Sequence, residues 1–394
     1  MAVKRRLCCA LWIFVACVPD LSYAQNQSAN EVLSFLLTTQ ALPTGDFVKD
    51  QQAAAATRDT LARALLVELS AVPLTTSSGG FNYRFNQSLG TLERVTRGFG
   101  PFFVDRATTA GAGQASISAT FRYSRFETLD GRNLRDGSLV TSSNKFRDEA
   151  APFDVETLAL NIETRTFTLF GNYGLTDRID LGIAIPVVQL SMSGQRVNTY
   201  RGATLLQARG QVDAIGLADI PLRSKVRLGQ IGAMNVATDV EVRFPTGDPD
   251  SLNGSGRYAF TGAVIGSAGE GAIEGHLNAG FTVGGASDQL TLAAAAEATL
   301  GDRVTFSGET LIRRVDRLRA IHDVSEPHPS ISGVNTLRLL PAGGATTTMS
   351  AVAGMRWNVT GTWLVNSYIV VPITDGGLHA RPTPAFSIDY SFVP

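Results

Sequence analysis

Apolar residues alternate with small or polar residues through one stretch of the chain, from Tyr173 to Leu190. Successive side chains of a strand point to opposite faces, so the alternation puts one set of residues on each face. The apolar set is Ile179, Leu181, Ile183, Ile185 and Val187, and the opposing set is Asp180, Gly182, Ala184 and Pro186. This period, preceded by a polar turn at 174–177, is typical of one strand of a membrane β-barrel. A half-buried strand of a soluble β-sandwich has the same period.

The alternation recurs at 113–129, 232–245, 303–317 and 383–392. It is clearest in the last of these stretches, where Phe386 and Ile388 alternate with Ser387 and Asp389. Ionic residues on the polar face are also allowed in a soluble sandwich, whose outer face meets water. The period alone therefore does not choose between a sandwich and a barrel.

The lengths of the connections favour the barrel. Twelve strands are predicted, at 113–129, 156–173, 178–193, 213–228, 232–245, 256–267, 271–285, 289–300, 303–317, 347–358, 362–373 and 383–392. Long loops, such as 130–155, 194–212, 246–255 and 318–346, alternate with short turns, such as 174–177, 229–231, 267–270, 301–302 and 359–361, except that the connection 286–288 is short. Short turns at one end and long loops at the other are typical of outer-membrane barrels, whose short turns are periplasmic. A tilted strand of about ten residues also rises roughly 23 Å, which suits an apolar band of about 25 Å.

The predicted fold class is therefore all-β, an antiparallel transmembrane β-barrel of about twelve strands, or about fourteen if a hairpin within 62–85 joins it. Closure requires the final strand to pair with the first, because an open edge in lipid leaves backbone groups unpaired. Aromatic residues near the strand ends are expected to form girdles: Tyr173, Phe244, Tyr258, Trp357, Trp363 and Phe392.

The N-terminus is typical of a secretory signal peptide. Basic residues at 4–6 precede an apolar core at 7–18 and a small-residue cleavage site that ends at Ala24. The core is shorter than the about 20 residues of a transmembrane helix, so strands would have to place the protein in a membrane. All three cysteines lie inside the signal. Cleavage before Cys17, as in a lipoprotein, is less favoured because Phe14 occupies a position that usually holds a small aliphatic residue.

The segment after the signal has a different pattern. Residues 31–39 and 46–69 are rich in Ala, Leu, Gln and Glu, with leucines at helical spacing, and Pro73 ends the second helix. Such a helix either packs against the barrel or plugs it. We expect a signal peptide at 1–24, an N-terminal periplasmic or plug segment with a hairpin option at 25–110, and the outer-membrane barrel at 111–394.

Composition agrees with this organisation. Charged residues make up 18% of the chain, below the roughly 25% of soluble domains, and there are 39 glycines. Loss of the signal removes three basic residues and Asp20, which takes the formal net charge from −1 to −3. Nothing in this balance points to nucleic acid.

No catalytic or metal motif stands out. The four histidines show no recognisable ligand spacing, and there is no GxSxG elbow or phosphate-binding glycine loop. A barrel enzyme would need a rim site, for which His322, His328 and His379 are the candidates. Asp248, Asp250 and the following Asn253 have oxygen ligands but lack the closing Glu of a calcium loop, so a polar hairpin loop is favoured. We expect no enzyme activity, no cofactor and no metal.

Charged residues on the inner face form the candidate site. They would pair with one another, hold a plug or line a polar path through the lumen. The candidates are Arg122, Arg223, Lys225, Arg227, Asp239, Glu241, Arg243, Glu309 and Arg313. Glu163 and Arg165 are also expected on this face, although the alternation slips between Ile162 and Phe167.

Several turns carry a family resemblance. The segment 173–182, Asp219-Ile220 with Arg223, the segment 244–248 with Gly254, and Pro372 with Gly377-Leu378 resemble the meta-pathway phenol-degradation family of outer-membrane proteins. That family is related to the long-chain fatty-acid transporter barrels. The resemblance covers most of 110–394 and implies an outer-membrane barrel that passes hydrophobic or aromatic compounds. Residues 25–110 lack the asparagine-proline-alanine start of the fatty-acid transporters.

The sequence thus predicts an outer-membrane channel for the passive diffusion of small hydrophobic compounds. The ligand would pass through the lumen or a lateral gap, and the N-terminal segment would gate this route. The expected partners are outer-membrane lipid, the barrel-assembly machinery and a small hydrophobic ligand. A structural or receptor barrel without transport is the alternative, and a barrel enzyme is less favoured.

Overall fold

The computed structural model describes residues 27–38, 44–71, 83–86, 91–94 and 96–392. Twelve antiparallel strands close into a barrel, as predicted, and each pairs with its two neighbours in the ring. In ring order they are β3 (Ala115–Leu129), β6 (Asp154–Thr176), β7 (Ile179–Tyr200), β9 (Ile220–Ile231), β10 (Met234–Phe244), β11 (Ala259–Glu270), β12 (Ile273–Gly284), β13 (Gln289–Leu300), β14 (Val304–Asp316), β17 (Ala345–Asn358), β18 (Trp363–Pro372) and β20 (Thr383–Phe392).

The last strand closes the ring on the first. β20 pairs with β3 from Ala385 opposite Arg122 to Phe392 opposite Ala115. Short turns such as 177–178 and 271–272 lie at one end of the barrel, here called the turn end, and the long connections lie at the other, the loop end. The predicted alternation of short and long connections is therefore confirmed, with the expected exception between β12 and β13 at 285–288.

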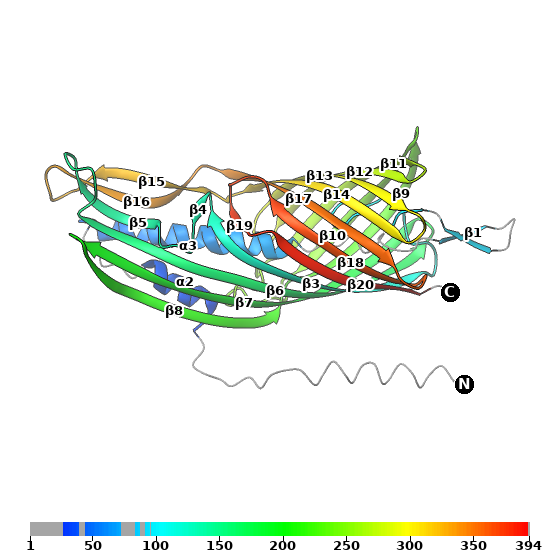
Figure 1. Cartoon of the computed structure of the whole chain (residues 1–394), viewed down its shortest axis with the longest axis horizontal. Coiled ribbons are helices and arrows are strands. Elements are labelled where there is room, and N and C mark those ends of the chain that lie inside the picture. Colours follow the sequence, from blue (N-terminus) through cyan, green and yellow to red (C-terminus); the bar gives the residue numbers. More distant parts are fainter. Residues whose placement is uncertain (1–26, 39–43, 72–82, 87–90, 95, 393–394) are drawn as a thin grey trace.

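The wall is much taller on one side at the loop end. Here β8 (Ala203–Leu217) pairs with β7, and β5 (Leu139–Phe146) joins β6 to β16 (Val334–Ala342), which pairs with β15 (Ala320–Pro327). These strands form a six-stranded sheet, the loop-end sheet, in the order β15-β16-β5-β6-β7-β8 (Figure 1). Two short strands, β4 (Arg132–Asn133) and β19 (Leu378–Ala380), pair with β3.

Three predicted loops are therefore wrong in part, because 130–155, 194–212 and 318–346 contain strands. The physical reason is a reversal of the apolar face. Along β7 the apolar residues up to Ile185 point outward, whereas Val188, Leu190 and Met192 are buried inside. Strand pairing continues beyond the apolar belt, but with a polar exterior, so the lipid-facing pattern ends before the strand does.

Two helices lie on the inner face of the loop-end sheet (Figure 1). They are α2 (Ala29–Thr38) and α3 (Phe47–Ser70), close to the predicted helices at 31–39 and 46–69. Asp46 caps α3, accepting a hydrogen bond from the backbone N–H of Lys49 at 3.1 Å. Buried leucines of both helices pack against β6 and β7 in one apolar cluster. Among the described residues, no helix is long and apolar enough to cross a membrane.

The expected hairpin within 62–85 does not join the barrel. Residues 62–70 belong to α3, whereas β1 (Tyr83–Asn86) pairs with β2 (Thr91–Arg94) as a separate two-stranded sheet at the turn end (Figure 1). Residues 75–80 of the expected hairpin lie outside the described residues. The barrel accordingly has twelve strands rather than fourteen.

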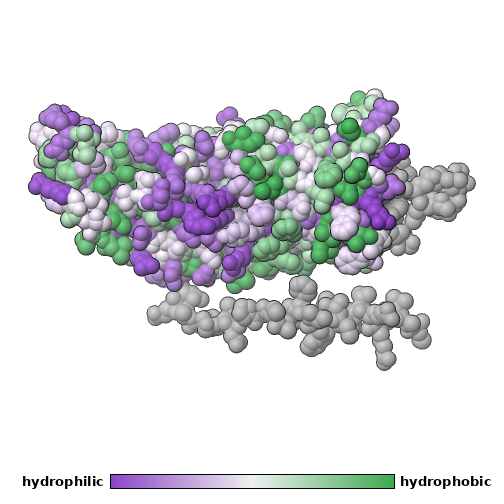
Figure 2. Space-filling model, viewed as in Figure 1, coloured by the Kyte–Doolittle hydropathy of each residue, from purple (hydrophilic) through white to green (hydrophobic). Residues whose placement is uncertain are grey.

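Large apolar side chains cover much of the exterior. Ile183 is 43% exposed and Leu277 is 63% exposed, whereas Asp180 and Ala184 are buried inside, so the facing predicted for β7 is confirmed. On the visible face, hydrophobic residues gather toward the turn end, and a hydrophilic region follows toward the loop end (Figure 2). The six aromatic residues named above for the girdles are all exposed.

Candidate functional site: a cavity inside the barrel

A segment with no regular secondary structure, residues 96–112, lies inside the barrel and is called here the lumen segment. Glu309 on β14 accepts three of its backbone hydrogen bonds, from Phe102, from Phe103 at 2.7 Å and from Val104 at 2.9 Å. Glu297 on β13 accepts another from Gly100 at 2.8 Å. Buried backbone donors need partners, and the inward carboxylates of the strands supply them here.

Basic residues of the wall hold the carbonyl groups of the same segment. Arg356 on β17 donates to the carbonyl oxygens of Gly100 and Pro101 at 2.8 and 2.7 Å. It also forms an ion pair with Asp389 on β20 at 3.0 Å. The guanidinium is thus buried with both its charge and its hydrogen-bond donors matched, which a buried charge requires.

A second ionic cluster ties the lumen segment to β9 and β10. Arg223 pairs with Asp105 of the lumen segment and with Asp239, the latter at 2.6 Å. Lys225 lies 3.8 Å from Asp105 and donates to the carbonyl oxygen of Arg106 at 3.3 Å. Of the predicted inward residues, Arg223 and Lys225 therefore contact the lumen segment directly, and Asp239 is linked to it through Arg223.

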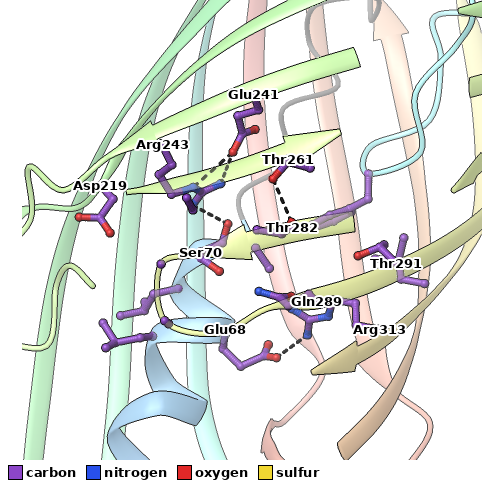
Figure 3. Close-up of a pocket in the computed structure, with 18 of the residues that line it drawn as sticks. Glu68, Ser70, Asp219, Glu241, Arg243, Thr261, Thr282, Gln289, Thr291 and Arg313 are labelled. Atoms are coloured by element: carbon purple, nitrogen blue, oxygen red, sulfur yellow. Dashed lines mark hydrogen bonds and ion pairs between the residues drawn. The ribbon is translucent and has the colours of Figure 1, made fainter. Parts of the chain in front are cut away.

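Three other predicted arginines, from strands spread around the barrel, contact the C-terminal end of α3, and Figure 3 shows two of them, Arg243 and Arg313. Arg122 donates to the carbonyl oxygen of Ala71 and Arg243 to that of Ser70, each at 2.8 Å. Arg313 pairs with the Glu68 carboxylate. The last carbonyls of a helix lack intrahelical partners and carry partial negative charge, so these guanidinium groups satisfy the helix end and complement its dipole.

Between α3 and the lumen segment lies a cavity of about 310 Å³. Its apolar lining includes Leu66, Leu69, Phe103 and Ile265, and its polar lining includes Thr261 and Thr282, whose hydroxyl groups are hydrogen-bonded at 2.9 Å (Figure 3). Cavities for small molecules begin at about 300 Å³ and combine an apolar lining with a few placed polar groups. The space suits a small molecule rather than a polymer.

The predicted site residues fall into three groups. Arg122, Arg223, Asp239, Glu241, Arg243 and Arg313 line the cavity. Glu309 and Lys225 face the lumen segment instead. Arg227 lies on β9 toward the turn end and is half-buried.

Glu163 and Arg165 were predicted wrongly, because they point outward. On β6 the neighbouring Ile162 and Thr164 are buried inside, so the odd-numbered residues face out. Glu163 lies 3.5 Å from Arg125 of β3, and Arg165 donates to Gln189 at 3.3 Å. Both belong to the polar exterior above the apolar belt, where ionic residues no longer mark the inner face.

The plug option for 25–110 did not single out the lumen segment or several of the residues that hold it. Residues 96–112 show neither a helical nor a strand period, and nothing in their pattern indicated that they enter the lumen. Glu297 and Arg356 stand on predicted strands, and the alternation of those strands could have found them.

Glu274, His276 and Glu297 carry donor atoms of metal-ligand type within 4.8 Å of one another. The His276 ring nitrogens already lie 2.9 Å from Ser267 Oγ and 3.4 Å from the Glu297 carboxylate. Glu297 also accepts from Gly100 of the lumen segment. These contacts assign the cluster to holding the lumen segment.

One of the three rim candidates, His328, has local hydrogen-bond partners. His328 Nδ1 accepts the backbone N–H groups of Ser330 and Ile331, both at 3.1 Å, which shapes its own loop. His322 lies on β15 and His379 on β19.

The Asp248 carboxylate accepts backbone hydrogen bonds from Asp250 and Ser251 at 3.1 and 3.2 Å. Together with the Ser251 hydroxyl, these bonds lower the pKa of Asp248. The Asp248 carboxylate thus closes its own polar hairpin loop.

No protein-family model and no curated protein matches this sequence. Among solved structures, an outer-membrane channel from Pseudomonas putida F1 aligns over 73% of this chain and 98% of its own, with 11% identity and a TM-score of 0.46. The KdgM porin aligns over 69% and 99%, with 8% identity and a TM-score of 0.36. The outer-membrane protease OmpT from Escherichia coli aligns over 71% and 97%, with 10% identity and a TM-score of 0.28. All of these identities and TM-scores are low, so function is inferred below from the geometry of this chain.

Proposed function

We propose that the protein is an outer-membrane channel for small hydrophobic or aromatic compounds, which it passes by diffusion. The observation that carries this proposal is the cavity of about 310 Å³, mainly apolar in its lining, inside a closed barrel with an apolar exterior. A barrel of this kind satisfies its backbone hydrogen bonds internally and can reside in lipid. A cavity of this size and lining suits one small apolar ligand.

The exterior supports a location in the outer membrane, after cleavage of a signal peptide near Ala24. Exposed aliphatic residues on most strands give way to polar residues at the loop end, which is the transition expected where a barrel leaves lipid. Outer-membrane lipid and the barrel-assembly machinery are the partners that this location implies.

Residues 25–110 gate the channel in this proposal. α3 stands on the loop-end side of the cavity and the lumen segment crosses the barrel on the other side, so both bear on any route through the lumen. A lateral route would pass the β10–β11 loop, whose Asn253 lies against Gly216 of β8. The same loop touches α2 through a hydrogen bond from Asn30 to the carbonyl oxygen of Asp250 at 2.9 Å. Movement of the helices and of this loop would thus be linked.

The resemblance of the turns to the meta-pathway phenol-degradation family agrees with this function and supplies the substrate class. Arg223 and Asp219, two residues that carry the resemblance, both line the cavity.

Liposome swelling tests the proposal. Liposomes that contain the purified protein should swell in small apolar or aromatic solutes faster than protein-free liposomes. Absence of flux, both for the full-length protein and for a variant without Arg122, Arg243 and Arg313, the strand residues that hold the end of α3, would eliminate transport and leave the structural or receptor barrel. Heat-modifiable mobility on gels tests the barrel separately.

The enzyme alternative has its own test. A rim enzyme would lose a lipid- or peptide-cleaving activity on His322→Ala, His328→Ala or His379→Ala. These histidines lie on β15, in the β15–β16 connection and on β19.

A further inference from the structure

Arg63 on α3 lies close enough to three arginines of the loop-end rim for their charges to act on it. The three are Arg257 in the β10–β11 loop, and Arg317 and Arg319 after β14, and together with Arg63 they are called here the arginine cluster. Burial lowers the pKa of Arg63, and the charges of Arg317, Arg257 and Arg319 lower it further, while Asp59 acts in the opposite direction. The three rim arginines thus repel the charge of Arg63, and an anion among them would relieve that repulsion.

The cluster has few anionic partners of its own. Arg317 lies 3.3 Å from the Asp288 carboxylate, and its side chain is nevertheless 64% exposed. Asp59 is already paired with Arg58 at 2.7 Å. Among the residues that the structure describes, Arg63, Arg257 and Arg319 make no ion pair.

Hydrogen bonds join the three rim segments that border the cluster. The backbone N–H of Gly285 donates to the carbonyl oxygen of Tyr258 at 2.8 Å, and that of Asp316 donates to the carbonyl oxygen of Asp288 at 2.9 Å. The Asp288 carboxylate also accepts from Gly284 at 2.7 Å. The backbone beside Arg257 and Arg317 is therefore tied into one rim, so the two guanidinium groups are presented together rather than on independent loops.

The rim stands where the apolar exterior ends. Phe260 on β11, Leu290 on β13 and Ile312 on β14 are exposed near the loop ends of their strands. Tyr258, next to Arg257, packs edge-on against Phe244 at a ring distance of 5.8 Å, as aromatic residues do at a membrane interface. Lipid headgroups lie at that level of a spanning barrel.

We propose that this arginine cluster binds the phosphate groups of an anionic lipid headgroup in the leaflet that surrounds the loop end. Guanidinium groups match phosphate oxygens in geometry and charge. Ser255 and Ser287 of the same rim also line the cavity, so the bound headgroup would sit beside the cavity wall. The inference rests on the proposed membrane location but does not require transport.

Native mass spectrometry of the full-length protein in detergent can test the site. The probes are bisphosphorylated lipid A, its monophosphorylated form, phosphatidylethanolamine and inorganic phosphate. The bisphosphorylated lipid should be retained most, and Arg257→Gln combined with Arg317→Gln should weaken its binding at least about tenfold, because two charge-assisted contacts are lost. Arg147→Gln combined with Arg201→Gln removes two exposed arginines elsewhere at the loop end and is the charge-matched control.

Three results would overturn the site: equal retention of monophosphorylated and bisphosphorylated lipid A, equal loss in the control, or displacement by inorganic phosphate at the concentration of the lipid. The comparison between wild-type ligands does not depend on any variant. Swelling assays report on the proposed transport independently, so failure of one proposal is distinguishable from failure of the other.

Discussion

The guanidinium of Arg243, on strand β10, donates to the carbonyl oxygen of Ser70 in the last turn of α3 over 2.8 Å. With Arg122 on β3 and Arg313 on β14, it holds one helix end from three sides of the barrel. These three contacts, called here the latch, join the wall of the barrel to the C-terminus of α3 beside the cavity.

Opening this latch should raise solute flux. Arg243→Ala removes a charge-assisted hydrogen bond worth about 1.5–3 kcal/mol and leaves Glu241 without its partner at 2.9 Å. We expect the end of α3 to loosen and swelling rates to increase, more so when Arg122→Ala is added. Arg147→Ala, at an exposed position far from the latch along the chain, should change neither. A rate that falls instead would mean that these arginines bind the solute rather than the helix.

The outward face of β7 makes a prediction about stability. Ile183→Arg places a charge in the apolar belt and should cost about 2–4 kcal/mol near the membrane midplane. The same substitution at Gln195, an exposed residue near the polar end of the same strand, should cost little. The yield of folded, heat-modifiable barrel measures both, and equal yields would contradict the position of the belt.

Filling the cavity should block the channel without unfolding the barrel. Ala263 on β11 lines the cavity, while its neighbour Val264 points outward and is exposed. Ala263→Phe should therefore reduce both the binding of a small aromatic probe and the swelling rate, and Val264→Phe should leave both near the wild-type level. A loss of flux in both variants would point to damage to the wall rather than to an occupied cavity.

Acid should loosen the β10–β11 loop. The folded-state pKa of Asp248 lies below its ordinary value of 3.8, chiefly because the Ser251 hydroxyl donates to its carboxylate. The carboxylate therefore stabilises the loop above pH 3.8, and this stabilisation disappears as pH falls through the folded-state pKa. Hydrogen exchange of the amides at 248–254, corrected for intrinsic rates, should accelerate over that window. Asp248→Asn should remove most of the pH dependence.

The twelve strands could be predicted because lipid imposes a strict rule on one face of each strand. Ile183 and Phe386 must be apolar where they touch lipid, and that requirement is visible as a period of two. The loop-end sheet escaped prediction because water replaces lipid there, and the inner face of β7 becomes the apolar one at Val188. The reversal also explains why Glu163 and Arg165 were assigned to the wrong face.

The segments that fill the barrel were harder to predict from the sequence than its strands. The pattern identified inward charges such as Glu309 and Arg313, but their partners are backbone groups and a helix end that lie far away in sequence. A carboxylate that accepts three backbone N–H groups has the same sequence signature as one that faces a water-filled pore. Which segment enters the barrel depends on those partners, and no period marks it.

The pairing of β20 with β3 has a consequence for the order of folding. Residues 96–112 find their hydrogen-bond partners on β13, β14 and β17, strands that are synthesised some two hundred residues later. The seam with β3 is formed by the last strand of all. An N-terminal piece that reached the membrane alone would expose buried backbone groups with nothing to satisfy them. The lumen segment, although it is made early, therefore reaches its final surroundings only after the last strands have formed.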